Sequence, residues 1–304
     1  MEINESSLNN INVRGIHMDS TWINAPAKIN LGLDVIRRRD DGYHEVKMIM
    51  QSIRLFDRLT LKKTKTPDIS LTTNLHFLPV NEDNLVYKSA RLLMEEFGIS
   101  EGVSIHLDKR IPVAAGMAGG STDAASCMIA MNRLFDLGLT DEDLKERGIT
   151  LGADIPYCIQ KGTALSEGIG EILSPLPPAP ACHILIAKPA FHVSTKFVYS
   201  NLVLDEATIH PDIDTMIECI RRRDLQALCD NMANILETVT IPAHPDIALI
   251  KQTMMENGAM GALMSGSGPT VFGIYDNQKD AMHAKEICRN LPCRCFVYVT
   301  DLYR

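Results

Sequence analysis

The stretch IPVAAGMAGGSTD at residues 111–123 is the most informative part of the sequence, and it lies between a predicted strand and a predicted helix. Glycine and alanine let the backbone approach a ligand closely, and glycine also accepts a positive φ. The first N–H groups of the following helix have no helical partner and carry partial positive charge. We therefore expect a phosphate to bind at this loop and the helix to begin at Ser121 or Thr122.

Two better-known phosphate motifs are absent from the loop. The P-loop requires a lysine after its glycines, and none follows here. The G-x-G-x-x-G pattern of dinucleotide-binding folds and protein kinases is also missing. A tight loop that ends in a plain helix cap is the alternative interpretation. A cap needs only one serine or threonine, whereas residues 114–122 hold three glycines, three alanines, a serine and a threonine.

Predicted strands and helices flank this loop without strict β-α-β alternation, which favours an α+β fold. Strands are expected at residues 21–36, 46–55, 58–63, 69–73, 103–107, 183–187, 270–275 and 296–300, with a hairpin at 165–173. Helices are expected at residues 85–97, 122–137, 214–222, 225–237, 245–257 and 279–289, and a short one from residue 140. Four prolines within residues 175–180 indicate a linker. The expected division is a flexible tail at 1–20 and two domains at 21–175 and 181–304.

The composition excludes several classes of protein. The 304 residues include 30 Lys+Arg and 38 Asp+Glu, a formal net charge of −8, which argues against coating nucleic acid or an anionic membrane. No apolar run approaches the ~18 residues of a membrane span, and residues 1–20 lack the pattern of a secretory signal. Eight cysteines without C-x-x-C spacing are expected to be reduced thiols. These features predict a cytoplasmic protein.

Two further short motifs are ambiguous when taken alone. SGSGPT at residues 265–270 precedes a strand, so its small residues can pack against a ligand or simply form a turn. LGADIP at residues 151–156 places Asp154 just before an apolar stretch, where a turn or cap role is the commoner one.

Together with two other segments, these motifs resemble the superfamily of galactokinase, homoserine kinase, mevalonate kinase and phosphomevalonate kinase, the GHMP kinases. The matching segments are APAKINL at 25–31, the loop at 112–126, LGADIP at 151–156 and SGSGPT at 265–270. Their order and spacing match from about Trp22 to the end of the chain. Within the superfamily, RDDGYH at 39–44 and EDNL at 82–85 select the branch that acts on a diphosphocytidyl derivative of methylerythritol.

The resemblance implies a two-domain GHMP kinase fold with the active site in the interdomain cleft. The N-terminal domain would bind ATP and the C-terminal domain would bind the substrate. The enzyme would transfer the γ-phosphate of ATP to a tertiary hydroxyl, on the non-mevalonate route to isoprenoid precursors. Its partner would be this small molecule, with no nucleic acid and no membrane, and the chain would be a monomer or weak homodimer. Another GHMP small-molecule kinase, homoserine or mevalonate kinase-like, or a non-catalytic nucleotide-binding regulator are the alternatives.

The resemblance assigns the catalytic roles to Lys28 and Asp154. Asp154 would accept or steer the proton of the attacking hydroxyl. Lys28 would keep Asp154 ionised and offset charge on the transferred phosphoryl group. Asn30 could bond the substrate hydroxyls.

The resemblance also implies a nucleotide site in which the loop wraps the β- and γ-phosphates of ATP. The loop departs from the common superfamily sequence G-L-G-S-S, so either Ser121 or Thr122 could face phosphate or Mg²⁺. Mg²⁺ is expected from ATP chemistry, but no acidic metal ligand stands out. Asn84 could instead cap the helix that follows it. The nucleotide-site residues are Asn84, Leu85, Lys109, Pro112, Ala115, Gly116, Met117, Ala118, Gly119, Gly120, Ser121 and Thr122.

Cytosine recognition falls, by the same resemblance, to Tyr43 and His44, with Thr195 and Tyr199 opposite them. An aromatic sandwich of this kind supplies ~1–3 kcal/mol of stacking. Without the resemblance, Tyr43 and His44 would be ordinary residues after a hairpin turn.

Overall fold

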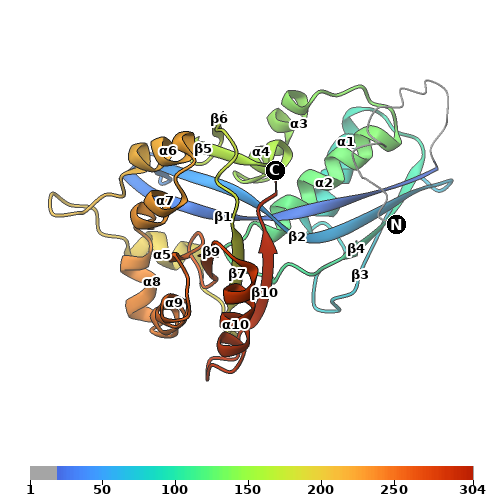
Figure 1. The fold of residues 1–304 in the computed structure, drawn as a ribbon. Helices are drawn as coiled ribbons and strands as arrows, with labels where there is room; N and C mark the ends of the chain where they lie inside the picture. Colours follow the sequence, from blue (N-terminus) through green and yellow to red (C-terminus); the bar gives the residue numbers. More distant parts are fainter. Residues whose placement is uncertain (1–18, 304) are drawn as a thin grey trace.

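The computed structural model describes residues 19–303, so the first eighteen residues of the expected flexible tail lie outside the described part. Strands β1 (Ser20–Arg38) and β2 (His44–Thr64) pair antiparallel into a ribbon that runs the length of the molecule (Figure 1). The two strands expected at 46–55 and 58–63 are one strand, because no glycine or proline interrupts residues 44–64.

The first sheet is built on this ribbon. Two shorter strands pair with the free edge of β2, β4 at one end and β5 at the other. Within this sheet, β3 and β4 pair in parallel. The added strands are β3 (Ile69–Thr73), β4 (Gly102–Asp108), β5 (Thr163–Glu167) and β6 (Ile172–Pro175). The helices of this half are α1 (Leu85–Glu96), α2 (Gly119–Leu134), α3 (Asp141–Gly148) and α4 (Ile155–Gln160).

The second sheet has the order β10-β7-β9-β8 and is antiparallel throughout. Its strands are β7 (His183–Lys188), β8 (Gly261–Met264), β9 (Val271–Tyr275) and β10 (Phe296–Asp301). The helices of this half are α5 (Thr195–Asn201), α6 (Ile213–Arg222), α7 (Leu225–Asn231), α8 (Glu237–Ala243), α9 (Asp246–Glu256) and α10 (Gln278–Arg289). Two mixed layers of this kind confirm the α+β class.

The helix expected at residues 225–237 begins as predicted, but it ends at Asn231, so its second half was wrong. Met232 is extended, and the chain then makes a β-bridge between Asn234 and Leu33 before α8 begins. The Asn234 amide also donates to the carbonyl oxygens of Met264 and Gly266, both at 2.8 Å. These tertiary bonds outweigh the local helical pattern. Strand β8 and helices α4, α5 and α8 were not expected either.

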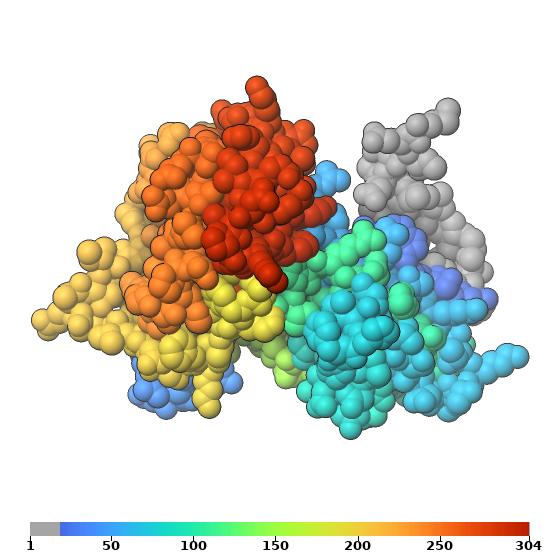
Figure 2. Space-filling view, turned by 90° about the horizontal axis from the view of Figure 1, so that it is seen from below, coloured from blue at the N-terminus to red at the C-terminus, as the bar shows by residue number. Residues whose placement is uncertain are grey.

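One hydrophobic core lies between the two sheets. It combines Ile29 and Ile49 of the first sheet with Ile184 and Ile186 of β7, while the alternate residue Leu185 packs into the other core cluster. Figure 2 shows the C-terminal residues packed directly against the first half of the chain. The first sheet ends before residues 176–182 and the second begins after them. Because the two sheets share one core, the division into domains at 21–175 and 181–304 remains a proposal.

Among residues 19–303, no helix has both the length and the apolar character needed to cross a membrane.

Candidate functional site

Irregular pairing in β1 decides which way Lys28 and Asn30 face. The register with β2 shifts between Pro26 and Lys28, and again between Asn30 and Gly32. Ala27 and Ile29, on either side of Lys28 in the sequence, fill the core between the two sheets. Since alternate side chains leave a strand on opposite faces, Lys28 and Asn30 point away from that core. Bulges commonly re-aim side chains in this way beside active sites.

The Lys28 amine is buried, with 6% of the residue exposed. It donates to Asn30 Oδ1 at 2.8 Å, and the Lys28 backbone N–H donates to the Met117 carbonyl at 3.2 Å. No carboxylate of residues 19–303 forms an ion pair with this amine. A buried ammonium without a carboxylate is suited to an anionic ligand, such as a phosphate.

Asp154 stands at the start of α4, half-buried, and its side chain makes no capping hydrogen bond. Its carboxylate is therefore not used to hold the helix. Burial raises the pKa of Tyr199 to about 12, and the charge of Asp154 adds to this shift. Burial also raises the pKa of the Cys158 thiol, where Asp154 adds to the shift and Lys28 opposes it. The side chains of Asp154 and Lys28 therefore both lie close enough to Cys158 to influence its pKa, although they form no direct ion pair.

A cavity of about 660 Å³ collects many of the predicted site residues from segments far apart in the sequence. They are Tyr43, His44, Ser121, Asp154, Thr195 and Tyr199. Arg38, Ala153 and Lys196 also line it and were not among the predicted site residues. Lys28 and Asn30 do not line this cavity.

The rings in this cavity are arranged differently from a simple two-by-two sandwich. His44 and Tyr199 already contact each other, with centroids 5.0 Å apart and planes tilted by 43°. No base fits between these two rings. Tyr43, 60% exposed, is free to stack. Burial and the neighbouring Arg38 lower the pKa of His44, so the ring is neutral at pH 7.

The glycine-rich loop has a strongly bent backbone. Ala114, Gly116 and Ala118 all have positive φ, at 51°, 70° and 53°. Helix α2 begins at Gly119, earlier than the expected Ser121 or Thr122, and its cap Ala118 offers no side-chain hydrogen bond. The first N–H groups of a 16-residue helix therefore remain available to a ligand.

Two hydrogen bonds tie the loop at 265–270 to the rest of the site. Ser265 Oγ donates to the Gly116 carbonyl at 2.9 Å. The hydroxyls of Thr195 and Ser267 lie 2.9 Å apart. The loop thus connects the glycine-rich loop to α5.

The Lys109 amine is held by two buried carboxylates. It lies 2.5 Å from Asp57 Oδ2 and 2.8 Å from Asp123 Oδ2. Asp57 also accepts the backbone N–H groups of Arg110 and Ile111. Burial lowers the pKa of Lys109, but the charges of Asp123 and Asp57 outweigh it and raise the pKa above its ordinary value. The Lys109 amine is therefore fully engaged by Asp57 and Asp123, so the backbone and aliphatic chain of Lys109 are the parts that could contact a nucleotide.

The sequence analysis missed Asp57 and Asp123. One available signal was that Asp57 alternates with the apolar residues Leu55 and Leu59, which predicts burial, and a buried carboxylate needs a partner. Burial raises the pKa of Asp123 well above its usual range, against the effect of Lys109.

The other predicted nucleotide residues have diverse surroundings. Asn84 caps α1, accepting from the Val86 N–H at 2.9 Å, which is the alternative role considered for it. Ala115 and Met117 are buried in the core between the sheets, so they anchor the loop. Leu85 is half-buried; a Cβ on Gly120 would lie 3.7 Å from its Cδ1. Pro112 lines a separate cavity of about 390 Å³.

The side chains near the glycine-rich loop fit a Mg²⁺ ion whose ligands are mainly phosphate oxygens and water. Residues 19–303 contain no cluster of three His, Cys, Asp or Glu side chains able to hold an ion. Ser121 lines the main cavity, whereas Thr122 is fully buried and its Oγ1 lacks a nitrogen or oxygen partner in the described part of the chain. Of the two hydroxyls, Ser121 is the one able to reach a ligand or its bound cation.

Two family models match the chain. The "GHMP kinases N terminal domain" covers residues 84–162 and the "GHMP kinases C terminal" model covers residues 216–296. Among curated relatives, a 4-diphosphocytidyl-2-C-methyl-D-erythritol kinase of Lachnoclostridium phytofermentans is 57% identical over 88% of this chain and 92% of its own length. The protein of the same name from Lachnospira eligens is 49% identical over 94% of this chain and 99% of its own length.

Solved structures agree with these matches. A crystal structure of 4-(cytidine 5'-diphospho)-2C-methyl-D-erythritol kinase has a TM-score of 0.81 and 31% identity, and it covers 93% of this chain and 100% of that one. A homoserine kinase from Cytophaga hutchinsonii has a TM-score of 0.78 at 20% identity, over 96% of this chain and 98% of that one, which shows a shared fold alone.

Proposed function

The chain belongs to the family of 4-diphosphocytidyl-2-C-methyl-D-erythritol kinases within the GHMP kinases, and on that premise we propose its reaction. It transfers the γ-phosphate of ATP to the tertiary hydroxyl of 4-diphosphocytidyl-2-C-methyl-D-erythritol, in the non-mevalonate route to isoprenoid precursors. The products are ADP and the phosphorylated cytidylyl compound.

One observation carries the proposal: three aromatic residues, Ser121 and Asp154 all line the same 660 Å³ cavity. The aromatic residues are Tyr43, His44 and Tyr199, while Ser121 stands at the start of α2 and Asp154 at the start of α4. Such a cavity suits a substrate that carries a planar base at one end and a hydroxyl at the other. The base would stack on Tyr43, because His44 and Tyr199 already contact each other.

Asp154 is positioned to handle the proton. In the transfer, the substrate hydroxyl oxygen forms a bond to the γ-phosphorus, and the bond from that phosphorus to the β,γ-bridging oxygen breaks. The hydroxyl proton passes to the Asp154 carboxylate, which no capping bond engages. Lys28, buried and lacking a carboxylate partner in residues 19–303, supplies positive charge for the phosphoryl group.

The nucleotide phosphates are expected on the glycine-rich loop, where the uncapped end of α2 offers N–H groups. The Ser121 hydroxyl would be the protein ligand of Mg²⁺, because it lines the cavity. Phosphate oxygens and water would complete the coordination of the ion. When bound, the ion would neutralise phosphate charge. The other predicted roles, from Asn30 at the substrate hydroxyls to Leu85 and Lys109 at the adenosine, remain parts of this proposal.

The enzyme is further proposed to work in the cytoplasm as a monomer or weak homodimer. Sedimentation at micromolar concentrations would test the second point, and a stable higher oligomer would contradict it.

A substrate panel tests the function. The purified chain is incubated with ATP, Mg²⁺ and, separately, the cytidylyl substrate, mevalonate and homoserine. We expect ADP release and a phosphorylated product only with the cytidylyl compound. Turnover of another alcohol alone would favour a different GHMP kinase. Tight nucleotide binding without any product would favour a non-catalytic regulator.

A further inference from the structure

The buried charged residues Asp57, Lys109 and Asp123 form a cluster, the Asp57 cluster, at the base of the glycine-rich loop. The proposed phosphoryl transfer gives no role to the two carboxylates. Replacement of buried ion pairs by apolar residues of similar volume is often neutral or stabilising, so stability alone is a weak reason for such a cluster. Charged side chains can, however, hold backbone N–H groups and an amine in a defined geometry, which apolar side chains cannot do.

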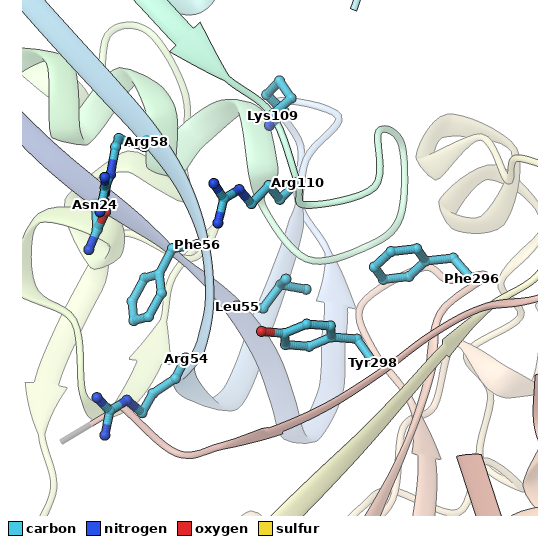
Figure 3. Close-up of a pocket in the computed structure, with 9 residues that line it drawn as sticks. All are labelled: Asn24, Arg54, Leu55, Phe56, Arg58, Lys109, Arg110, Phe296 and Tyr298. Atoms are coloured by element: carbon cyan, nitrogen blue, oxygen red, sulfur yellow. Dashed lines mark hydrogen bonds between the residues drawn. The ribbon is translucent and has the colours of Figure 1, made fainter. Parts of the chain in front are cut away.

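Asp57 fixes the segment that leads into the glycine-rich loop. Figure 3 shows Phe56, Arg58 and Arg110 around one surface cavity, so β2 and the segment after β4 lie side by side there. Asp57 stands between Phe56 and Arg58 in the sequence of β2. Its Oδ1 accepts the backbone N–H groups of Arg110 at 2.5 Å and Ile111 at 2.8 Å. The first residue of the loop, Ile111, is therefore bound to β2.

The second oxygen of Asp57 reaches the far end of the loop through Lys109. Asp57 Oδ2 lies 2.5 Å from Lys109 Nζ, and the same amine donates to Asp123 Oδ2 of α2 at 2.8 Å. A Cβ on Gly119 would lie 3.2 Å from this Nζ, so the first residue of α2 packs closely against the amine. One carboxylate thus connects the beginning of the loop to its end.

The Lys109 backbone is held by a side chain from a third segment. Asn74, the residue after β3, accepts the Lys109 N–H at 2.8 Å and donates to the Lys109 carbonyl at 3.0 Å. Between the two fixed ends, Ala114 and Ala118 have positive φ, which alanine rarely adopts. Such conformations persist only where the surrounding structure holds them in place.

We propose that Asp57 is a positioning residue for ATP: it fixes both ends of the glycine-rich loop and so keeps the uncapped N–H groups of α2 where the phosphates bind. This inference deepens the proposed function and rests on it. Asp57 itself is 0% exposed, and three donors from residues 109–111 occupy its oxygens, so it acts through the loop. A direct phosphate contact by the Lys109 amine is the alternative, but it would leave two buried carboxylates without their cation.

Calorimetric titration of the purified full chain with ATP and Mg²⁺ tests the proposal. Asp57→Ala removes both connections and should raise the Kd for ATP about tenfold or more, because the loop N–H groups are misplaced. KM for the cytidylyl substrate, measured at saturating ATP, should stay unchanged. An unchanged Kd for ATP would overturn the proposal. A lower Kd would also overturn it, because the freed Lys109 amine would then be a phosphate ligand.

Asp57→Asn is the conservative variant. It keeps an oxygen for the N–H groups of Arg110 and Ile111 but loses the charge that holds Lys109. Its Kd for ATP should therefore lie between the values of the unchanged chain and Asp57→Ala. If Asp57→Ala does not fold, Asp57→Asn decides the outcome, and an unchanged Kd in Asp57→Asn would then overturn the proposal.

Ile250→Ala separates positioning from a general loss of stability. Ile250 is fully buried in α9 and lines none of the cavities named above. This variant should unfold at a lower urea concentration and keep the Kd for ATP. A rise in Kd as large as that of Asp57→Ala would overturn the proposal. Absence of ATP binding by the unchanged chain would contradict the proposed function itself, whereas normal ATP binding by Asp57→Ala would contradict this inference alone.

Discussion

The contact between the glycine-rich loop and the loop at 265–270 predicts the effect of a single methyl group. A Cβ on Gly116 would lie 2.3 Å from the Ser265 carbonyl oxygen and 3.1 Å from that of Gly268. Both neighbours are backbone atoms, which cannot swing aside as a flexible side chain can. Gly116→Ala must therefore separate the two loops by about 1 Å to reach an ordinary contact.

The magnitude has two parts. Alanine at φ 70° costs about 1–2 kcal/mol in the left-handed region. Separating the loops also breaks the 2.9 Å hydrogen bond from Ser265 Oγ to the Gly116 carbonyl, worth about 1 kcal/mol. We expect Gly116→Ala to lower the free energy of unfolding by about 2–3 kcal/mol. Because the loop is displaced by about 1 Å, kcat/KM for ATP should fall about 100-fold.

Gly138→Ala is the matched control. Its φ is 71°, and a Cβ there would meet nothing within 4 Å. This variant should lose only the conformational part, about 1–2 kcal/mol, and keep normal kcat/KM. Urea unfolding and initial rates at varied ATP measure both quantities. Equal stability loss in the two variants, with normal ATP kinetics for Gly116→Ala, would refute the reasoning.

Four further outcomes are expected. Asp154→Asn should lower kcat by about 10²–10⁴ with an unchanged Kd for ATP, since the carboxylate caps no helix, and an equal loss of both would show a structural role. Tyr43→Ala should raise KM for the cytidylyl substrate by about 5–150-fold, from ~1–3 kcal/mol of stacking, and leave stability intact because Tyr43 is 60% exposed; an unchanged KM would remove it from the site. The pKa of His44 is lowered from 6.5, so KM for the cytidylyl substrate should stay constant above pH 6.5. KM should rise below the lowered pKa, because the imidazolium cannot accept a hydrogen bond. His44→Gln should abolish this pH dependence, and the same rise in KM in the His44→Gln variant would contradict the prediction. Lys109→Met should lower the free energy of unfolding, measured in urea, by about 3–5 kcal/mol, because the buried carboxylates of Asp57 and Asp123 lose their cation. A variant with normal stability would contradict the buried ion-pair cluster.

Interactions between neighbouring residues explain which features could be predicted from the sequence. Asn84 caps α1 and Thr140 forms a capping box with Asp143, because these bonds span only two or three residues. The glycine-rich loop between strand and helix was recognisable for the same reason. Its helix nevertheless begins at Gly119, because Ala118 adopts a left-handed conformation that composition does not encode.

The amino-acid sequence by itself determined the α+β class, most of the strands and helices, and the glycine-rich connection between strand and helix at residues 111–123, since each depends on short-range spacing and backbone freedom. Only the tertiary structure decided how distant groups meet. Register shifts in β1 turn Lys28 away from the inter-sheet core, and Asp57 and Asp123 close around Lys109 across 66 residues of chain. Strand register and buried ion pairs are chosen by packing over the whole fold, because one slipped residue reverses a side chain and one unpaired charge is costly to bury.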